Sequence, residues 1–581
     1  MKLSAHVIDY LSEQKITHIF EVCGGALAHL LDSLYGRTDI TTVSMHHEMA
    51  AAIAAEGYAR ASENFGVAMA TSGPGATNLI TGIGSCYFDS IPCMFITGQV
   101  NTYEYKYLNP VRQNGFQETD IVSIVTPIVK KAVMVDNPEN ITCLLEHLID
   151  EMKTRRNGPV LMDIPLDIQR ADIDVSNTKN KHPLTKHINL KIPSGRMDAI
   201  HNEIDKSTRP IILSGGGVRS SHSCELLSTF AHKYGIPVVT SLMGLDSFPH
   251  DDPLFCGMIG TYGNRYANLA IANSDLVIVL GSRLDSRQTG TSPETFARKA
   301  VFIHVDIDAA EIHNKISPLI AIHADINAFL TKIIAKKYEN KNNYTQWLKK
   351  IGDYKQQYPS YIKPSGELIN PNHFIHCLSK TLPDDAIICV DVGQTQMWSA
   401  QSTIIKGTQR FLTQGGMASI GSALPLAIGA AFAKPNQQII AITGDGGFQL
   451  NIQELQTVFH YDLPIKIVML NNNGYGLIKQ FQEQYMESRF QSSGIGFSNP
   501  DFQNVVGAYK IKTNKITTNN EINKAIKTLL IDMKPGFLEV IIDPTARALP
   551  KLSVNQPIED QEPLVSREEL QKNMIIDMLR S

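Results

Sequence analysis

Two short polar motifs, each following an apolar run, constrain the fold of this chain more than any other feature. Gly444-Asp445-Gly446 follows the run 438–442, and Asn471-Asn472 follows the run 464–470. The stretch 451–461 between them has a helical pattern, so the unit reads as strand, turn, helix and strand. Both motifs then lie at the carboxyl ends of neighbouring strands, where open α/β sheets bind ligands. The sequence predicts a doubly wound α/β domain with a ligand site at this edge.

The residue types in the two motifs suit a phosphate group held through a divalent cation. Glycines let backbone N–H groups approach a phosphate closely. The carboxylate of Asp445 and an asparagine side chain offer the hard oxygen ligands that Mg²⁺ prefers, and the substrate's phosphates supply the rest. Either motif alone would read as an ordinary polar turn or strand end. The two together, at this spacing, favour a metal and phosphate site.

The composition of the 581 residues argues against several other classes of protein. Apolar residues make up 43% and charged residues 19%, as in ordinary α/β proteins, and the formal charge of −4 suggests neither nucleic acid nor a membrane as partner. No apolar run reaches the roughly 18–20 residues of a membrane helix, and residues 1–20 read as an amphipathic helix rather than a signal peptide. We expect a cytoplasmic protein whose eight scattered cysteines are buried free thiols.

The chain divides into three α/β sections and a tail. The first and third sections share a layout, because Gly73-Pro74-Gly75 and Gly444-Asp445-Gly446 are each followed by a helix, a proline and a strand. In the middle section, the runs 210–217, 275–281 and 301–306 predict buried parallel strands. Links near 174–192 and 335–365 are predicted to be exposed connectors. The predicted domains are 1–175, 190–335 and 365–545, with a tail at 546–581 that ends in an amphipathic helix.

Further segments resemble the acetolactate synthase family of thiamine-diphosphate (ThDP) enzymes, and the glycine and asparagine motifs resemble the ThDP-fold signature. The resemblance covers nearly the whole chain and implies three doubly wound parallel-sheet domains: pyrimidine-binding, middle FAD-type and diphosphate-binding. The segments that carry it are His47-Glu48, Glu56-Gly57-Tyr58-Ala59-Arg60, Ile96-Thr97-Gly98-Gln99-Val100, Gly158-Pro159-Val160-Leu161-Met162-Asp163-Ile164-Pro165, Asp391-Val392-Gly393-Gln394 and Asn451-Ile452-Gln453-Glu454-Leu455.

The resemblance assigns roles around the reactive half of ThDP. Glu48 is implied to hydrogen-bond the aminopyrimidine ring and promote its imino tautomer, whose nitrogen then removes the thiazolium proton. Glu56, by contrast, is predicted to be a solvated helix glutamate. Ile420, where the family usually has Met, is implied to be the apolar prop that bends the cofactor; on composition alone it would be ordinary core. Two further implied positions are the Gly24-Gly25 turn, where Cys23 replaces the usual Pro, and Gln117, which faces the reacting carbon.

The resemblance also implies a metal site and an oligomer. Asp445, the side chain of Asn472 and the carbonyl of Gly474 are implied to bind Mg²⁺. Glu48 and Asp445 lie on different modules, and in this family on different subunits, so a homodimer is the smallest active unit expected; a homotetramer is the alternative. The sequence leaves open a regulatory subunit but does not indicate one. The positions implied to lie along the diphosphate are Gly393, Gln394, Gly446 and Gly447.

The middle domain resembles that of family members which bind FAD without using its redox chemistry. The segment 257–261 matches the surroundings of the isoalloxazine ring, although Ile259 replaces the usual His. The alternative is an inherited fold without flavin, because none of the glycine clusters has the Gly-x-Gly-x-x-Gly form of a dinucleotide site. The implied FAD positions are Gly215, Gly216, Gly217 and Arg283 at the phosphates, Asp306 and Asp325 at the adenosine, and Arg156 on the dinucleotide.

The implied reaction is decarboxylation of a 2-oxo acid, most simply pyruvate, and transfer of the two-carbon unit to a second carbonyl compound. Arg287 keeps a basic family position that attracts the carboxylate of the acceptor. Leu166 replaces a family lysine and Phe481 a family tryptophan, with Leu477 in the same segment as Phe481. A pocket change of methylene size shifts discrimination by roughly 1–3 kcal/mol. These changes either reshape the acceptor side or are neutral drift at a channel mouth.

Several functions stay open on the sequence alone. The segments 546–553 and 557–560 look like homologues associated with surface-polysaccharide synthesis, in which an acetyl unit passes from pyruvate to a nucleotide ketosugar. That transfer is the main alternative to an acetolactate-forming carboligase. A pyruvate oxidase, a decarboxylase and a catalytically silent binding subunit are the others, and intact Glu48, Asp445 and Asn472 argue against the last.

Overall fold

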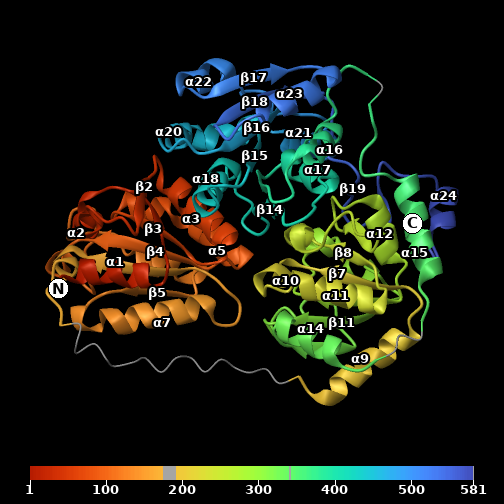
Figure 1. Ribbon diagram of the computed structural model, residues 1–581, viewed down its shortest axis with the longest axis horizontal. Coiled ribbons are helices and arrows are strands. Elements are labelled where there is room, and N and C mark those ends of the chain that lie inside the picture. The colour runs from red at the N-terminus through yellow and green to blue at the C-terminus, as the bar shows by residue number, and fades with distance from the viewer. Residues whose placement is uncertain (175–191, 339–341, 365, 580–581) are drawn as a thin grey trace.

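The computed structural model describes residues 1–174, 192–338, 342–364 and 366–579, and within these ranges the chain forms three α/β domains (Figure 1). Each domain is built on a six-stranded sheet in which every pair of neighbouring strands is parallel. Helices cover both faces of the sheets. The predicted fold of three doubly wound parallel-sheet domains is confirmed. No helix within the described ranges is long and apolar enough to cross a membrane.

The first and third sheets have the same strand order. In chain order within each domain, both sheets read 2-1-3-4-6-5, so the shared layout seen in the sequence is a repeated fold. The first sheet contains β1 (His18–Val22), β2 (Thr41–Ser44), β3 (Gly66–Ala70), β4 (Cys93–Gln99), β5 (Lys131–Met134) and β6 (Val160–Pro165). The third contains β13 (Ile387–Val390), β14 (Arg410–Leu412), β15 (Ile439–Gly444), β16 (Ile465–Asn471), β17 (Lys512–Ile516) and β18 (Gly536–Ile541).

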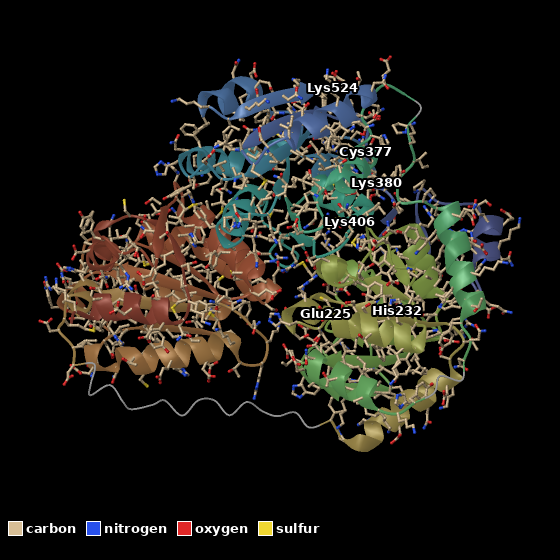
Figure 2. All side chains as sticks on the ribbon, viewed as in Figure 1. Glu225, His232, Cys377, Lys380, Lys406 and Lys524 are labelled. Atoms are coloured by element: carbon tan, nitrogen blue, oxygen red, sulfur yellow. The ribbon has the colours of Figure 1, made fainter. Side chains whose placement is uncertain are left out.

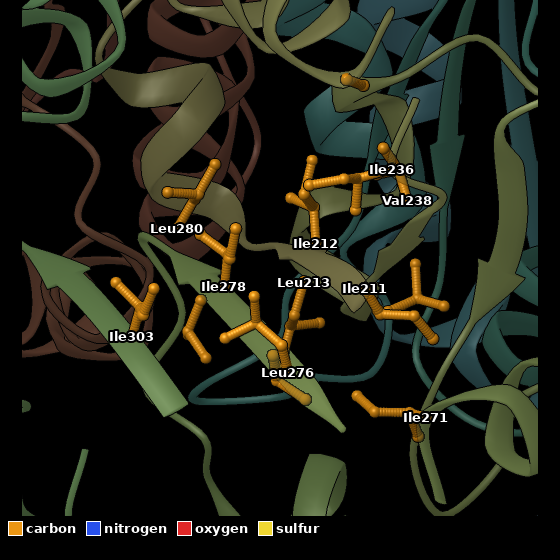
Figure 3. Close-up of a cluster of buried hydrophobic side chains, with 14 of the residues drawn as sticks. Ile211, Ile212, Leu213, Ile236, Val238, Ile271, Leu276, Ile278, Leu280 and Ile303 are labelled. Atoms are coloured by element: carbon orange, nitrogen blue, oxygen red, sulfur yellow. The ribbon is translucent and has the colours of Figure 1, made fainter. Parts of the chain in front are cut away.

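The middle sheet has the other doubly wound order, 3-2-1-4-5-6, which is typical of dinucleotide-binding folds. All three strands predicted here form, and their isoleucines, leucines and valines fill the domain core (Figure 3). In this order the topology reverses between β7 and β10, which places a crevice at their carboxyl ends. The strands are β7 (Pro210–Ser214), β8 (Val238–Thr240), β9 (Phe255–Met258), β10 (Leu276–Leu280), β11 (Val301–Asp306) and β12 (Ile320–His323).

The helices carry apolar residues toward the sheets and charged residues outward, as Glu225, Lys380 and Lys524 show on three of them (Figure 2). In the first domain they are α1 (Leu3–Glu13), α2 (Ala28–Leu34), α3 (Glu48–Ser62), α4 (Pro74–Asn78), α5 (Ile80–Asp89), α6 (Ile121–Val125), α7 (Ile141–Lys153) and α8 (Leu166–Gln169). In the middle domain they are α9 (Ser194–Lys206), α10 (Gly216–Ser220), α11 (Cys224–Tyr234), α12 (Arg265–Ala272), α13 (Ser286–Thr289) and α14 (Ile326–Ala335). In the third they are α16 (Pro371–Thr381), α17 (Gln394–Ser402), α18 (Ala423–Ala433), α19 (Asp445–Phe448), α20 (Leu455–His460), α21 (Gly476–Tyr485), α22 (Phe502–Ala508) and α23 (Ile522–Leu529).

Four sequence predictions about local structure were wrong in part. The helix predicted over 1–20 ends at Glu13, a turn follows at Lys15, and β1 takes up the remainder. The helix predicted over 451–461 is a 3₁₀ turn followed by α20, because Asn451 has non-helical dihedral angles. The eight cysteines are free thiols as predicted, but only four of them are buried, three are half-buried and Cys23 is exposed. The connector predicted at 335–365 contains α15 (Thr345–Gln357), which buries Trp347, Ile351 and Tyr354. Most of the connector predicted at 174–192 lies outside the described residues.

The tail joins the third domain to the middle domain. Its two short strands, β19 (Lys551–Leu552) and β20 (Gln561–Glu562), pair antiparallel, and α24 (Arg567–Asn573) follows as predicted. The backbone N–H of Leu552 donates to the carbonyl of Thr261, and Leu570 of α24 is buried in the core of the middle domain. The tail is therefore a structural part of two domains.

The first and third domains meet where α3 lies against α18. A Cβ atom built on Gly57 would overlap the carbonyl of Leu426, and one on Gly429 would overlap the carbonyl oxygen of Ala54. The two helix backbones are thus as close as glycine permits. Because α3 begins at Glu48, this crossing fixes where the predicted catalytic glutamate stands relative to the third domain.

Gly429→Ala is expected to lower the apparent melting temperature, because the added methyl group would overlap the carbonyl oxygen of Ala54. Overpacking of this kind costs about 1–3 kcal/mol, and differential scanning fluorimetry measures the shift. The matched control is Gly507→Ala on exposed α22, where an added Cβ meets no atom within 4 Å and helix propensity favours alanine. Equal melting temperatures for Gly429→Ala and the wild type would contradict the close approach.

Candidate active site

The carboxyl end of β15 presents a buried carboxylate with an ordered set of neutral donors. Asp445 is 1% exposed, and its Oδ2 accepts hydrogen bonds from the backbone N–H of Gly474 at 2.9 Å and from Nδ2 of Asn499 at 2.6 Å. Burial raises the pKa of Asp445, and these donors act in the opposite direction. A buried carboxylate with neutral donors and no basic partner among these contacts can accommodate a cation.

The neighbouring strand end presents an amide with a fixed orientation. Nδ2 of Asn472 donates to Oε1 of Gln394 at 2.9 Å, which leaves Oδ1 of Asn472 as an oxygen that can ligate a metal. Gly476, which opens α21, keeps this arrangement open because a side chain there would collide with both amides. Three predicted positions, Asp445, Asn472 and Gly474, are thus brought together at one sheet edge.

The predicted diphosphate glycines are required by their surroundings. A Cβ atom on Gly446 would lie 2.5 Å from the ring of Tyr475, and one on Gly447 would overlap the carboxylate of Asp391. Gly393 has a φ of +120°, a backbone conformation that residues with a side chain rarely adopt. It precedes the first turn of α17, and a Cβ atom built on it would meet no atom within 4 Å. Open N–H groups at a helix start suit a phosphate oxygen.

Asp391 holds the loop that carries Ile420. Its Oδ1 accepts from the backbone N–H groups of Gly421 and Ser422 at 2.8 and 3.2 Å, and its Oδ2 accepts from Oγ1 of Thr443 at 2.7 Å. Burial raises the pKa of this carboxyl to about 6. Ile420 itself is 37% exposed, so its side chain is open to a ligand rather than being ordinary core.

The same loop is held from the first domain by two acidic side chains, the half-buried Asp89 and the fully buried Glu56. Asp89 at the end of α5 accepts from the N–H groups of Gly415 and Gly416 at 2.9 and 2.7 Å. Glu56 accepts from Nε2 of Gln414 at 2.8 Å and pairs with Arg60 on the next turn of α3. The prediction that Glu56 is solvated was therefore wrong. It is 0% exposed, because α3 lies with this face against the third domain.

Glu48 stands at the switch point of the first sheet. It is the first residue of α3 and half-buried, and its Oε2 accepts from Nδ2 of Asn78 at 2.9 Å. A Cβ atom built on Gly75, which follows β3, would lie 3.4 Å from Oε1 of Glu48. The Gly24-Gly25 turn follows the adjacent strand β1, and a Cβ on Gly24 would contact Thr71. The carboxylate is thus oriented by one neutral donor and has room at its open side.

Gln117 lies on a loop that is organised by buried acidic residues. Its φ of +63° is left-handed, and its backbone and Cβ approach Gly73. The adjacent Glu118 accepts three backbone N–H groups, from Lys106, Asn114 and Gly115, at 2.6–3.1 Å. Gln99 joins this loop to the sheet, because its Nε2 donates both to the carbonyl of Thr119 and to Oδ2 of Asp163.

Within one chain, the predicted catalytic residue Glu48 and the predicted metal ligand Asp445 have separate sets of hydrogen-bond partners. Glu48 contacts residues of the first domain, and Asp445 contacts residues of the third. The link between the domains that lies nearest to Glu48 along the chain is made two residues before it, where the N–H of His46 donates to Oε1 of Glu454 at 3.0 Å.

A cleft of about 510 Å³ lies at the switch point of the middle sheet and extends to the first domain. Most of the predicted FAD positions line it: Arg156, Gly216, Gly217, Arg283, Asp306 and Asp325. Gly215 is not among the lining residues. A Cβ there would overlap the carbonyl of Gly281, so packing between the two loops accounts for this glycine. Burial raises the pKa of Asp306 to about 6, and Arg156 pairs with Glu311 at 2.8 Å.

A smaller cavity of about 70 Å³ adjoins this cleft and connects it to the loop of the third domain. Arg287 and Ile259 line it from the middle domain, and Gly415 and Ala418 line it from that loop. A ligand in the cleft would therefore end beside the segment that carries Ile420.

Known proteins match the chain along most of its length. Residues 1–124, 197–333 and 391–540 match the N-terminal TPP-binding, central and C-terminal TPP-binding domains of thiamine pyrophosphate (ThDP) enzymes. The acetolactate synthase large subunit of Cyanidium caldarium is 37% identical over 563 residues, 94% of each chain. That of Lactococcus lactis subsp. lactis is 34% identical over 94% of this chain and 93% of its own. A probable acetolactate synthase large subunit of Methanocaldococcus jannaschii is 36% identical over 95% and 93%.

The chain belongs to the acetolactate synthase large-subunit family of ThDP enzymes. The resemblance read from the sequence motifs is confirmed, and the protein is a ThDP-dependent enzyme. The two positions predicted to depart from the family, Leu166 and Phe481, and the neighbouring Leu477 are at least partly exposed. Phe481 on α21 is 48% exposed and contacts Tyr485, whereas Leu477 and Leu166 are half-buried at the starts of α21 and α8.

Several residues of this acetolactate-synthase-like site escaped prediction from sequence. Asp391 is the first residue of a segment that carries the family resemblance, so the sequence did point to its position. Asn499, by contrast, lies in a loop with no recognisable pattern. In the sequence, Gln480 looks like an ordinary helix glutamine and Asp89 like the end of a helix. Their hydrogen-bond partners, Ala548 and Gly415, are far away in the chain.

Asp163→Asn is expected to change how stability depends on pH. Burial raises the pKa of Asp163 to about 7, so between about pH 4 and 7 the folded state binds a proton that the unfolded chain does not. The wild type therefore loses stability as the pH rises through this window. Asparagine keeps the contacts, because the hydroxyl of Thr97 can accept as well as donate.

The variant should be more thermostable than the wild type at about pH 8, and the difference in melting temperature should shrink toward about pH 5. Thermal melts of both proteins between about pH 5 and 8 measure this difference in melting temperature. A difference that stays constant with pH would contradict the raised pKa of Asp163.

Proposed function

We propose that this enzyme decarboxylates pyruvate with ThDP and Mg²⁺ and transfers the two-carbon unit to a second carbonyl compound, forming acetolactate when that compound is also pyruvate. The observation that carries the proposal is the edge of the third sheet, where Asp445, Asn472 and Gly474 converge beside glycines that tolerate no side chain. The residues fit a metal diphosphate, because two oxygen ligands and open N–H groups lie together.

Each residue has a definite task in this proposal. When bound, ThDP would supply the carbon nucleophile for the 2-oxo acid and accept the electron pair that stays behind when CO₂ leaves. Asp445, the Oδ1 of Asn472 and the carbonyl of Gly474 hold the Mg²⁺. Glu48 keeps its carboxylate, oriented by Asn78, for a hydrogen bond to the aminopyrimidine ring. Ile420 offers an exposed aliphatic side chain as the prop.

The cleft of the middle domain supports FAD as a further, non-redox ligand. Its volume lies within the range of small-molecule sites, about 300–1,000 Å³, and it starts at the switch point where dinucleotides bind. Arg283 and the backbone at Gly216 suit the phosphates, and Asp306 and Asp325 suit the adenosine end. The place of the usual histidine is taken by Ile259, which offers only an apolar contact.

The acceptor defines a second candidate function. Arg287 lines the small cavity beside the third-domain loop, which favours an anionic acceptor. However, Leu166 has no charge to attract a carboxylate, and the exposed Phe481 offers a smaller ring than tryptophan. These features favour transfer of the same unit to a larger anionic acceptor, a nucleotide ketosugar.

Incubation of the purified protein with Mg²⁺, ThDP, FAD and pyruvate alone is expected to consume pyruvate and form acetolactate, measured by a colorimetric assay. Glu48→Gln should lower turnover by roughly 10²–10⁴, the usual contribution of a group that controls proton transfer, while ThDP binding persists. Slow acetolactate formation that gives way to rapid pyruvate loss on adding a nucleotide ketosugar would establish the second candidate. Full turnover by Glu48→Gln would exclude the proposed role of this carboxylate.

A homodimer would complete the site. Glu48 and Asp445 contact different domains of one chain, and the loop that carries Gln117 exposes a group of large apolar side chains beside it. An exposed apolar group of this kind marks a surface that a partner covers. The residues are Tyr103, Tyr107, Leu108, Val111 and Phe116, with Leu108 fully exposed. We propose that a second copy of the chain covers this loop and supplies its Glu48 to the Asp445 of the first.

Co-expression of Glu48→Gln with Asp445→Ala tests this sharing of residues. Each variant alone should be inactive. In a mixed dimer one site carries both substitutions and the other carries neither, so random pairing should restore roughly a quarter of the wild-type activity. Isolation of the mixed dimer by two affinity tags gives the measurement. If Glu48 and Asp445 served within one chain, the mixed dimer would remain inactive.

A further inference from the structure

We propose that Gln480 is a positioning residue of the metal site, through which a peptide group of the tail sets the orientation of the Asn472 amide. The inference rests on the proposed Mg²⁺ and ThDP site. It concerns residues that the proposed function does not use, namely Gln480 on α21 and Ala548 in the tail.

The side chain of Gln480 pairs with both polar groups of Ala548. The backbone N–H of Ala548 donates to Oε1 of Gln480 at 2.9 Å, and Nε2 of Gln480 donates to the carbonyl of Ala548 at 3.2 Å. The oxygen and nitrogen of a side-chain amide can exchange places by a flip, but a backbone N–H can only donate and a carbonyl can only accept. The backbone of the tail therefore fixes which way the Gln480 amide points.

The orientation of the Gln480 amide in turn fixes the orientation of the Gln394 amide, and through it that of Asn472. Oε1 of Gln480 also accepts from Nε2 of Gln394 at 3.0 Å, so the oxygen of Gln394 must point the other way. That oxygen accepts from Nδ2 of Asn472 at 2.9 Å. Oδ1 of Asn472 is consequently the atom left for a cation. Reversal of any amide would place two donors or two acceptors against each other.

Burial makes the amide chain specific. Gln394 is 5% exposed, Gln480 is 6% exposed and Ala548 is fully buried, so water has little access to replace a lost partner. The tail is held at this place by the same two helices. Trp398 of α17 donates to the carbonyl of Arg547 at 3.1 Å, and Arg547 pairs with Glu483 of α21. The peptide at Ala548 is thus anchored independently of the amides that it orients.

Gln484, one turn further along α21, provides a matched control. It also binds the tail, because its Nε2 donates to Glu562 at 2.8 Å and its Oε1 accepts from Lys551. These hydrogen bonds of Gln484 join it to the tail and not to Gln394. Loss of Gln484 therefore weakens the attachment of the tail without touching the amide chain.

The experiment compares Gln480→Met, Gln480→Glu and Gln484→Met with the wild type by titrating Mg²⁺ into protein with ThDP and following ThDP binding by calorimetry. Met removes the acceptor that Gln394 needs, whereas Glu keeps that acceptor and, when protonated, can also donate to the carbonyl of Ala548. Loss of a group that orients a metal ligand typically weakens metal binding about 10–100-fold. We expect such a rise in the Mg²⁺ midpoint for Gln480→Met only.

Melting temperatures without cofactor separate this effect from a folding defect, since Gln480→Met and Gln484→Met should lower them to a similar extent. An unchanged Mg²⁺ midpoint for Gln480→Met, or an equal rise for Gln484→Met, would overturn the role of Gln480 while the wild type still bound ThDP. Absence of Mg²⁺-dependent ThDP binding by the wild type would overturn the proposed function itself.

Discussion

The close crossing of α3 and α18 is the constraint on which the arrangement of the site depends. Gly57 and Gly429 let the two backbones touch, and each helix has a segment of the candidate site at its amino-terminal end. Helix α3 begins with Glu48, and α18 follows the loop with Ile420. A change in the distance or angle of the crossing would move one segment relative to the other. Residues that never contact a ligand thus determine the geometry of those that do.

Carboxylates that are buried or half-buried hold the segments that this crossing positions. Glu56, Asp89 and Asp391 all bind in or beside the loop 414–422, and backbone or side-chain N–H groups satisfy them. Burying a charge is costly unless it is paired and hydrogen-bonded, so the loop is held only in the conformation that supplies those donors. Burial raises the pKa of all three carboxyls. Such an arrangement favours one defined loop structure over maximal stability.

The sequence predicted the parts of the fold that depend on short-range patterns. Apolar runs located β7, β10, β11, β15 and β16, and the glycine and asparagine motifs fell at the strand ends where they were expected. Glu56 was misjudged because a lone glutamate among alanines reads as solvated, and its burial depends on distant partners such as Gln414. For the same reason the Lys- and Asn-rich link hid α15. Periodicity reports which face is apolar but not which distant element covers it.

Neutral amides suit the task of orienting a metal ligand beside Asp445. An ionised side chain in place of Gln394 would change the balance between the cation and the diphosphate, and it would itself need a buried partner. An amide transmits direction without charge, because its donor and acceptor ends are distinct. The cost is that a chain of amides has two consistent orientations unless one end is fixed. A backbone peptide supplies that fixed end, and the tail brings one, at Ala548, to the helix that needs it. The tail is therefore as much a part of the site's architecture as the strands that end there.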